Sequence, residues 1–396
     1  MSLPTSSSSN DNLIYLFSSA PPDRPDYKRG VLNALCYPAG HLLKLNYRRD
    51  YFQPSLFDGR ERLRGRRAVF VFIDYRALTA TNDHDFIPIR FLRLLDVSPK
   101  EEAENYLETT RVYIRVELGE FIFSTPTSST EIGSIPDRPR PYNGNPGEKR
   151  NYFYVVEGAN KFSQPNRLSQ QDTLDHMIQR VAKSDSLSSC VFLSTGNVQP
   201  FKNGKPVCGL VEYGEEQKAY RLQTNNIYRL DLRVFDPKRA SGSRYEIAVR
   251  SSSDFIAVSQ PFSIALGGPI DHSALLVCKR TTESTLATLE VEVKGVRTSA
   301  GGEDRTLPGN ALGDVIAAEP VYLLDIRPAK WVLPAFVILV FVGVLSTSTS
   351  PEFFKEFEFL CYPQSLALVC KTLGAGALAA AAYLAFRKLP SGGGNS

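Results

Sequence analysis

Short apolar runs, many of them alternating with polar positions, recur along the first 328 residues. Such runs predict strands, here at residues 13–17, 31–37, 41–48, 68–75, 86–97 and 111–123. Pro38, Ala39 and Gly40 suit a hairpin turn between the second and third strands, and Ser98, Pro99 and Glu101 suit a short helix start. Together these elements predict an N-terminal β domain over residues 12–123.

The pattern changes twice in the middle of the chain. Residues 124–150 are rich in Pro, Gly and Ser, which predicts a linker or a long exposed loop. Within residues 151–215 lies one amphipathic helix at 172–183, with Leu174, Met177, Ile178 and Val181 on its apolar face. We therefore expect a small mixed α/β segment between two β domains.

About seven short strands follow at roughly even spacing between residues 216 and 328. This spacing is typical of an immunoglobulin-like β-sandwich, although the Cys, Trp and Cys core mark of true immunoglobulin domains is missing. The strand spacing therefore predicts an architecture and does not indicate a function.

Two long apolar segments end the chain. Residues 331–350 carry no charge, and residues 366–386 carry only Lys371. A bilayer core needs about 20 helical residues, so both segments have the length of transmembrane helices. The fold class predicted is mainly β, with two or more β-sandwich-like cytosolic domains followed by a C-terminal two-helix transmembrane hairpin. Residues 351–365 would be an interfacial connector, and residues 1–11 and 387–396 disordered ends.

Charge and cysteine usage predict the orientation of this hairpin. Basic residues precede the first segment (Arg327, Lys330) and follow the second (Arg387, Lys388), whereas the connector has one Lys and three Glu. The start of the chain lacks a signal-peptide pattern, and the six cysteines lie far apart. We therefore expect both termini in the cytoplasm, at a plasma or inner membrane. The alternative is that one segment, the second more readily, is a buried core helix.

A stripe of small residues runs along the second segment at helical spacing. Such stripes let membrane helices pack closely, either against the first segment or in self-association. Its members are Thr372, Ala375, Gly376, Ala379 and Ala382.

Motifs for catalysis and cofactors are missing from the sequence. The spacings of a P-loop, a nucleophile elbow, a zinc protease or a zinc ribbon do not occur. His84 in a polar run and His176 on the predicted helix are candidates for a metal ligand and a base, but both patterns are commoner at solvated surfaces. We predict no catalytic residue, no metal site and no cofactor.

The most suggestive pattern in the soluble part is basic. A charge of +4 over the whole chain is too small to favour nucleic acid as a partner. Within residues 44–67, however, arginines interleave with aromatic residues, and Arg binds phosphate groups well. The candidate residues are Arg48, Arg49, Arg60, Arg62, Arg64, Arg66 and Arg67. They could form a solvated loop, contact anionic lipid, or bind a phosphorylated or nucleotide ligand.

The leading hypothesis is a membrane-anchored cytosolic binding or sensing protein, with the lipid bilayer and a protein as partners. The first alternative is a membrane-perturbing effector of a defence or cell-suicide type, whose hairpin forms homo-oligomers after sensing. A membrane-bound enzyme without a recognisable motif is the second alternative.

Overall fold

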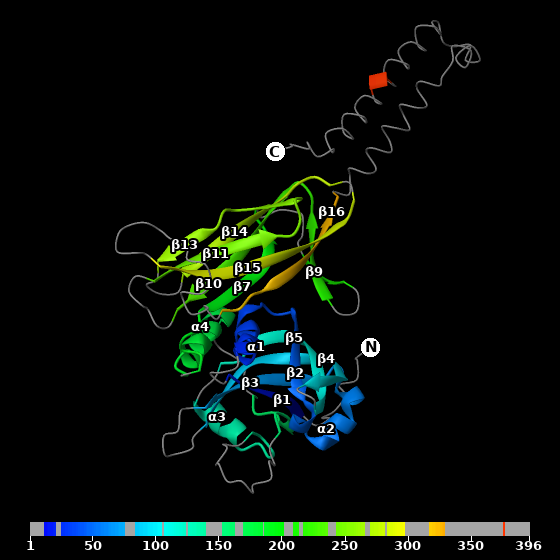
Figure 1. The fold of residues 1–396 in the computed structure, drawn as a ribbon, viewed down its shortest axis with the longest axis vertical. Coiled ribbons are helices and arrows are strands. Elements are labelled where there is room, and N and C mark those ends of the chain that lie inside the picture. Colours follow the sequence, from blue (N-terminus) through cyan, green and yellow to red (C-terminus); the bar gives the residue numbers. More distant parts are fainter. Residues whose placement is uncertain are drawn as a thin grey trace, which may run out of the picture.

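The computed structural model describes residues 12–20, 25–75, 84–104, 107–123, 126–139, 153–162, 169–184, 186–201, 209–213, 217–236, 243–265, 270–281, 283–297, 317–328 and 375–376. Over these ranges the chain is mainly β, with three sheets and few helices (Figure 1). The coarse fold class expected from the sequence is therefore confirmed.

A mixed six-stranded sheet forms the N-terminal body, with the strand order β2-β5-β4-β3-β1-β6. The neighbours β1 and β3 are parallel, and the other neighbouring strands are antiparallel. The strands are β1 (Asn12–Ser19), β2 (Leu42–Arg48), β3 (Arg67–Tyr75), β4 (His84–Glu104), β5 (Leu107–Phe121) and β6 (Val155–Ala159).

Both faces of this sheet are buried, because β1 and β3 carry apolar side chains on both sides. Phe70 and Phe72 join the core that contains the helix α1 (Pro25–Cys36). Val71 and Ile73 join a second core that contains Ile132 of α3 (Pro126–Gly133). The N-terminal body is thus a sheet with helices on opposite faces rather than a sandwich of strands.

Three local expectations in this body are wrong. Residues 31–36 of the strand expected at 31–37 are the second half of α1, which buries Val31, Leu32 and Leu35 at helical spacing. The turn expected at residues 38–40 therefore joins a helix to a strand and does not form a hairpin. The helix start expected at Ser98 lies inside β4, whose pairing with β5 continues as far as Glu104. Cross-strand pairing over this long hairpin satisfies the backbone and overrides the local capping signal.

The expected linker and the expected mixed α/β segment contribute to the larger bodies. Within the linker range, α3 and the residues after it bury Ile132 and Ile135. β6 completes the N-terminal sheet, and β7 (Phe192–Pro200) and β8 (Gly209–Tyr213) join the C-terminal sheets. Residues 140–150 of the expected linker lie outside the described part.

Two further sheets form the C-terminal body, called here the two-sheet body. Their orders are β12-β14-β10-β7 and β13-β11-β15-β16-β9-β8. Buried residues of both sheets, such as Leu230 and Leu289, belong to one core. The remaining strands are β9 (Gln217–Gln223), β10 (Asn226–Phe235), β11 (Ser243–Ser251), β12 (Ile256–Val258), β13 (Phe262–Ala265), β14 (Ile270–Cys278), β15 (Thr285–Arg297) and β16 (Val321–Arg327).

The two ends of the two-sheet body have different neighbours. At one end, the junction pole, α1 packs on β7, and Lys218 of β9 reaches Glu117 of β5 at 2.5 Å. At the other end β16 finishes at Arg327, whose carbonyl accepts a 3.0 Å hydrogen bond from the Thr224 amide. We call this end the exit pole; among the described residues it comprises 201, 224–227, 254–256, 277–281, 283–286 and 327. Figure 1 shows the N-terminal body below the two-sheet body, and β16 ends at the upper end of the two-sheet body.

The C-terminal apolar segments lie almost wholly outside the described residues. Ala375 and Gly376 are the exceptions, and both are helical and exposed. Within the part of the chain that is described, no helix is long and apolar enough to cross a membrane. The predicted hairpin is therefore untested.

Candidate functional site

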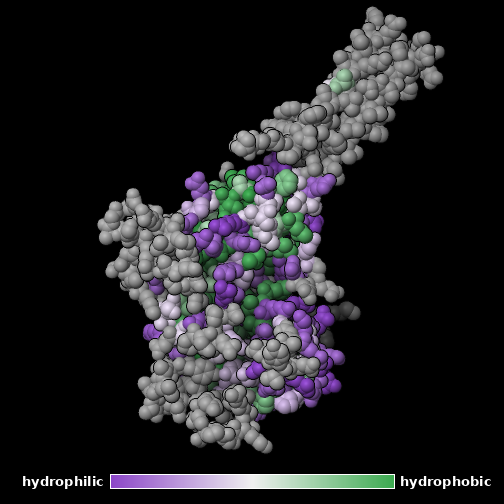
Figure 2. All heavy atoms as spheres, in the orientation of Figure 1, coloured by the Kyte–Doolittle hydropathy of each residue, from purple (hydrophilic) through white to green (hydrophobic). Residues whose placement is uncertain are grey.

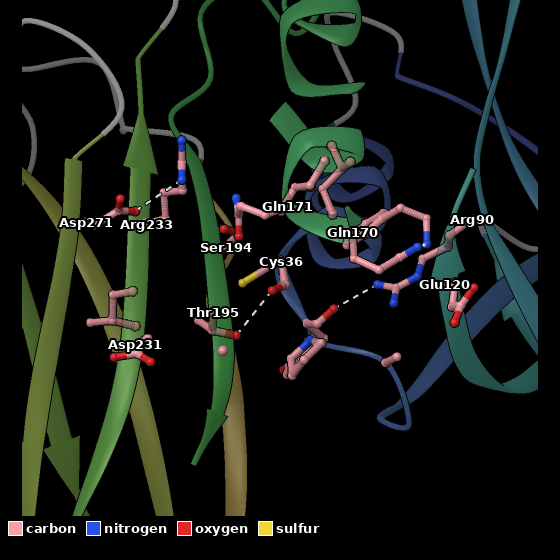
Figure 3. A pocket seen from close by; sticks show the side chains of 18 of the residues that line it. Cys36, Arg90, Glu120, Gln170, Gln171, Ser194, Thr195, Asp231, Arg233 and Asp271 are labelled. Carbon is pink, nitrogen blue, oxygen red and sulfur yellow. Dashed lines mark hydrogen bonds and ion pairs between the residues drawn. The ribbon is translucent and has the colours of Figure 1, made fainter. Parts of the chain in front are cut away.

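A cleft of about 800 Å³ opens where the N-terminal body meets the junction pole. Its walls come from several elements (Figure 3): the end of α1, β4 and β5 on one side, and β7, β10 and β14 on the other. The helix α4 (Gln170–Val181) contributes Gln170 and Gln171. A concave site between two bodies is a common location for ligands, and this cleft is the candidate site.

Arg90 of β4 holds the N-terminal wall of the cleft in place. Its guanidinium group is fully buried, and within the described ranges it donates hydrogen bonds to three backbone carbonyls: Ala34 at 2.9 Å, Tyr37 at 2.7 Å and Gly119 at 3.0 Å. Burial lowers the pKa of Arg90 to about 9, which still leaves the group charged at neutral pH. The ring of Phe121 covers it, with 4.2 Å between the guanidinium carbon and the ring centroid.

This arginine serves as the C-terminal cap of α1. The last carbonyls of a helix lack partners within the helix and carry its negative dipole end, so a cation there is stabilising. α1 has no basic residue in its own last turn, and Arg90 from the neighbouring strand takes that role. Gly119 lets β5 approach β4 closely next to Arg90, because a Cβ there would lie 2.9 Å from the Phe91 carbonyl oxygen.

Behind the cleft, an aromatic cluster joins the two bodies. His41 follows α1 and packs against Tyr37, Tyr220 and Tyr322 at ring-centroid distances of 5.6, 5.4 and 5.4 Å. Burial lowers the pKa of His41 to about 4, a shift that the nearby Pro38 carbonyl partly offsets. His41 is therefore neutral at physiological pH.

Hydrogen bonds and ion pairs complete the junction. The Thr195 hydroxyl donates to the Cys36 carbonyl at 3.1 Å and also bonds the Tyr322 hydroxyl. The Val321 amide donates to the Tyr37 hydroxyl at 2.9 Å. Burial raises the pKa of Tyr37 to about 12, so this phenol stays protonated.

Glu117 is the anionic centre of the same junction. It accepts hydrogen bonds from Lys218 and Arg93, and these outweigh burial and lower its pKa. Lys218 also donates to the Gly40 carbonyl at 2.9 Å, beside the loop that precedes His41.

The chemistry of the cleft suits binding better than nucleophilic catalysis. Burial raises the pKa of the Cys36 thiol far above its usual value, so the nucleophilic thiolate does not form. Figure 3 shows Arg233 next to Asp271 on the two-sheet wall, and Arg233 also pairs with Asp175 of α4 at 2.7 Å. The charges of this wall are thus already paired, and the lining offers amides, hydroxyls and carboxylates to a polar ligand. In the described ranges, no three His, Cys, Asp or Glu residues form a group that could hold a metal.

The predicted basic residues lie away from this cleft, on the segment from β2 to β3. The guanidinium groups of Arg49 and Arg60 pack on one ring, 4.6 and 5.2 Å from the Phe57 centroid. Arg62 and Arg64 are exposed, and neither has an ion pair among the described residues. We call Arg48, Arg49, Arg60, Arg62 and Arg64 the arginine patch.

Two of the predicted basic residues are engaged elsewhere. Arg66 pairs with Glu157 of β6 at 2.6 Å, and the guanidinium of Arg67 lies 5.1 Å from the Phe91 centroid. Arg66 thus forms an ion pair and Arg67 contacts a different ring, whereas the members of the arginine patch have no ion pair among the described residues.

The remaining candidates lie apart from the cleft or outside the described part. His176 is exposed on α4, with its ring 4.7 Å from that of Phe123. His84 begins β4 opposite Tyr75. Thr372, Ala379 and Ala382 of the small-residue stripe lie outside the described residues.

Sequence reasoning missed the two residues that organise the junction. Arg90 stands in an apolar stretch of β4, and a lone charge in such a stretch was the available signal. His41 gave no local signal, because its partners Tyr220 and Tyr322 come from distant strands. Neither the protein-family models nor the curated proteins searched contain a match to this chain.

Proposed function

We propose that the protein is a membrane-anchored binding protein that presents its arginine patch to a phosphate-bearing partner in the cytosol. Residues 331–350 and 366–386 would be the transmembrane hairpin, with both termini cytoplasmic. One observation carries the proposal: the chain leaves the two-sheet body at the pole opposite the N-terminal body.

In this proposal, the two-sheet body is an immunoglobulin-like sandwich. Its strand orders fit the ABED and CFG sheets of that architecture, with β7, β10, β11, β12, β14, β15 and β16 as strands A to G. Three strands are additions to this pattern: β13 at the edge beside β11, and β9 and β8 beyond β16.

Such a sandwich would act as a spacer between the bilayer and the N-terminal body. β10 is a ten-residue strand that runs from the exit pole to the junction pole, which is about 33 Å at about 3.3 Å per residue. The Debye length is about 8 Å at physiological ionic strength. At that distance the membrane surface potential is screened from the arginine patch, so a soluble partner fits the patch better than lipid.

The arginine patch has the chemistry of a phosphate site. Guanidinium groups bind phosphate oxygens through paired hydrogen bonds, and hydrogen bonds to charged groups contribute about 1.5–3 kcal/mol each. Stacking on Phe57 fixes Arg49 and Arg60 beside each other before a ligand arrives. We infer that these two residues form the centre of the binding surface.

The test is calorimetric titration of inorganic triphosphate into the full chain in mild detergent. We expect the double change Arg49→Ala and Arg60→Ala to weaken binding at least about tenfold, since two charge-assisted contacts are lost. Arg250→Ala is the matched control, because Arg250 is an exposed arginine of β11 that pairs with Glu292. Equal affinity in the double variant and the control would remove the patch from the proposal without affecting the anchor.

The effector hypothesis is the second candidate, and the cleft is the observation that favours it. Because the cleft is lined by both bodies, a ligand there would contact both and could alter how they pack. Toxicity on overexpression that depends on Gly376 and Ala379 would favour this function over passive anchoring.

A further inference from the structure

Exposed apolar side chains gather at the exit pole. Of the eight large hydrophobic residues that are exposed in the described part of the chain, five lie there: Phe201, Ile227, Phe255, Val277 and Leu286. Single exposed apolar residues are ordinary on a protein surface, but a group at one end of a body marks a contact surface.

Four of these side chains are neighbours on the outer face of one sheet. Ile227 of β10 pairs with Val277 of β14, and Val277 pairs with Ala257 of β12. The Phe201 amide donates to the Ile227 carbonyl at 2.9 Å, which continues the row by one strand. Phe255 lies next to this row, because the Phe255 carbonyl accepts a 2.7 Å hydrogen bond from the Lys279 amide.

Leu286 extends the surface to the other sheet. It is 43 % exposed at the start of β15, opposite Asp325. Apolar side chains therefore project from both outer faces of the two-sheet body at the same pole. Figure 2 shows hydrophobic residues, in green, at the upper end of this body.

The covalent chain sets how far this pole can be from the proposed anchor. Four residue steps separate Arg327, the last residue of β16, from Trp331, the first residue of the uncharged segment. A fully extended chain covers at most about 14 Å in that number of steps. If residue 331 enters the membrane, the exit pole must lie at or near the headgroup layer.

Charge at the exit pole is close to balanced. Its charged side chains include Lys279, Arg280 and Arg327 and, of opposite sign, Asp254 and Glu283. Contact with a bilayer would therefore come from the apolar residues and depend little on anionic lipid.

We propose that the exit pole is a lipid-contacting surface that seats the two-sheet body in the headgroup layer of the bilayer holding the hairpin. This inference rests on the proposed membrane anchor. The exit pole would make a second membrane contact, formed by folded β structure, and this contact would fix the orientation of the two-sheet body. The N-terminal body then points away from the membrane.

Tryptophan quenching by spin-labelled lipid tests the two claims separately. Trp331 is the only tryptophan of the chain and reports on the anchor in the native protein. In a Trp331→Phe background, Phe255→Trp reports on the exit pole. Tyr213→Trp reports on the junction pole, because Tyr213 pairs with Gln217, the neighbour of Lys218. Each variant is reconstituted as the full chain into phosphatidylcholine vesicles that carry a nitroxide close to the headgroup.

We expect quenching of Trp331 and of the tryptophan at 255, and none at 213. Adding Ile227→Ser and Val277→Ser should reduce the quenching at 255, because both side chains are exposed and the fold does not depend on them. Quenching of Trp331 without quenching at 255 overturns the lipid-contacting surface and leaves the anchor standing. Quenching at both 255 and 213 overturns the upright orientation, and an unquenched Trp331 overturns the anchor together with this inference.

Discussion

Replacing Arg90 by Met is expected to destabilise the protein by about 3–5 kcal/mol. Removing one partner of a buried charged contact has a cost of this size, because the other partner stays buried without hydrogen bonds. Here the partners left without these hydrogen bonds are the carbonyls of Ala34, Tyr37 and Gly119, which belong to the backbone and stay in place in the variant. Urea unfolding of the full chain in mild detergent, followed by circular dichroism, measures the loss.

The matched control for this prediction is Arg93→Met on the same strand. Arg93 is 56 % exposed and shares Glu117 with Lys218, so its loss should change the free energy of unfolding by less than about 1 kcal/mol. Arg90→Lys should fall between the two, since an ammonium cannot reproduce the planar fork. A stability of Arg90→Met within about 1 kcal/mol of the wild type would show that Arg90 does not cap α1.

The second large effect is a loss of stability in acid that depends on His41. In the unfolded chain the imidazole takes up a proton near pH 6.5, whereas in the folded protein it does so only near pH 4. Between these values the unfolded state binds the proton, so the stability present above pH 6.5 falls as the pH falls towards 4. This difference in the pKa of His41 corresponds to about 3 kcal/mol in the free energy of unfolding.

His41→Phe should remove this part of the pH dependence. The ring would still pack among Tyr37, Tyr220 and Tyr322, but it would carry no titrating group. The comparison is the difference in the free energy of unfolding between wild type and variant at several pH values from 7 to 4. Tyr220→Phe, which loses a hydrogen bond to Asn197 without changing a group that titrates in this range, should keep the wild-type slope. If the pH dependence of the free energy of unfolding in His41→Phe equals that of the wild type, the assignment of this acid sensitivity to His41 is contradicted.

Periodicity predicted several strands and the helix α4, and it failed where contacts between distant segments determine the local structure. The runs that became β1, β3 and β5 and the helix α4 are legible in the sequence, because their apolar spacing matches their burial. The segment 31–37 contains enough apolar residues for either a strand or a helix. Its helical form depends on packing against the sheet and on the Arg90 cap, which comes from β4.

The candidate site was less predictable than the fold. The arginine patch is a local feature, so the sequence showed its residues, but not the distinction between Arg66, which pairs with Glu157, and the residues without such a pair. The cleft assembles from α1, α4, β4, β5, β7, β10 and β14, and the aromatic cluster includes side chains of β9 and β16. No pattern within a single segment predicts such an assembly, since its members are separated by up to 285 residues, as between Tyr37 and Tyr322.

The fold adds to the membrane proposal an orientation of the two bodies, which the sequence alone does not provide. The sequence left three interpretations of the arginines open: a solvated loop, contact with anionic lipid, and a phosphorylated or nucleotide ligand. The structure places the arginine patch on the N-terminal body and the end of β16 at the opposite pole. A contact of the patch with the bilayer that is proposed to anchor the chain would require the two-sheet body to lie flat.

Cysteine labelling of intact cells tests the membrane anchor and its orientation most directly. Cys361 lies in the connector expected outside the membrane, and Cys36, Cys190 and Cys278 are buried in the folded protein. With Cys208 and Cys370 changed to Ser, an impermeant maleimide should label Cys361 in intact cells. A cysteine introduced by Tyr213→Cys should react only after the cells are permeabilised. Labelling of the cysteine at 213 in intact cells, or protection of Cys361 until permeabilisation, would contradict a cytosolic body held by a membrane hairpin.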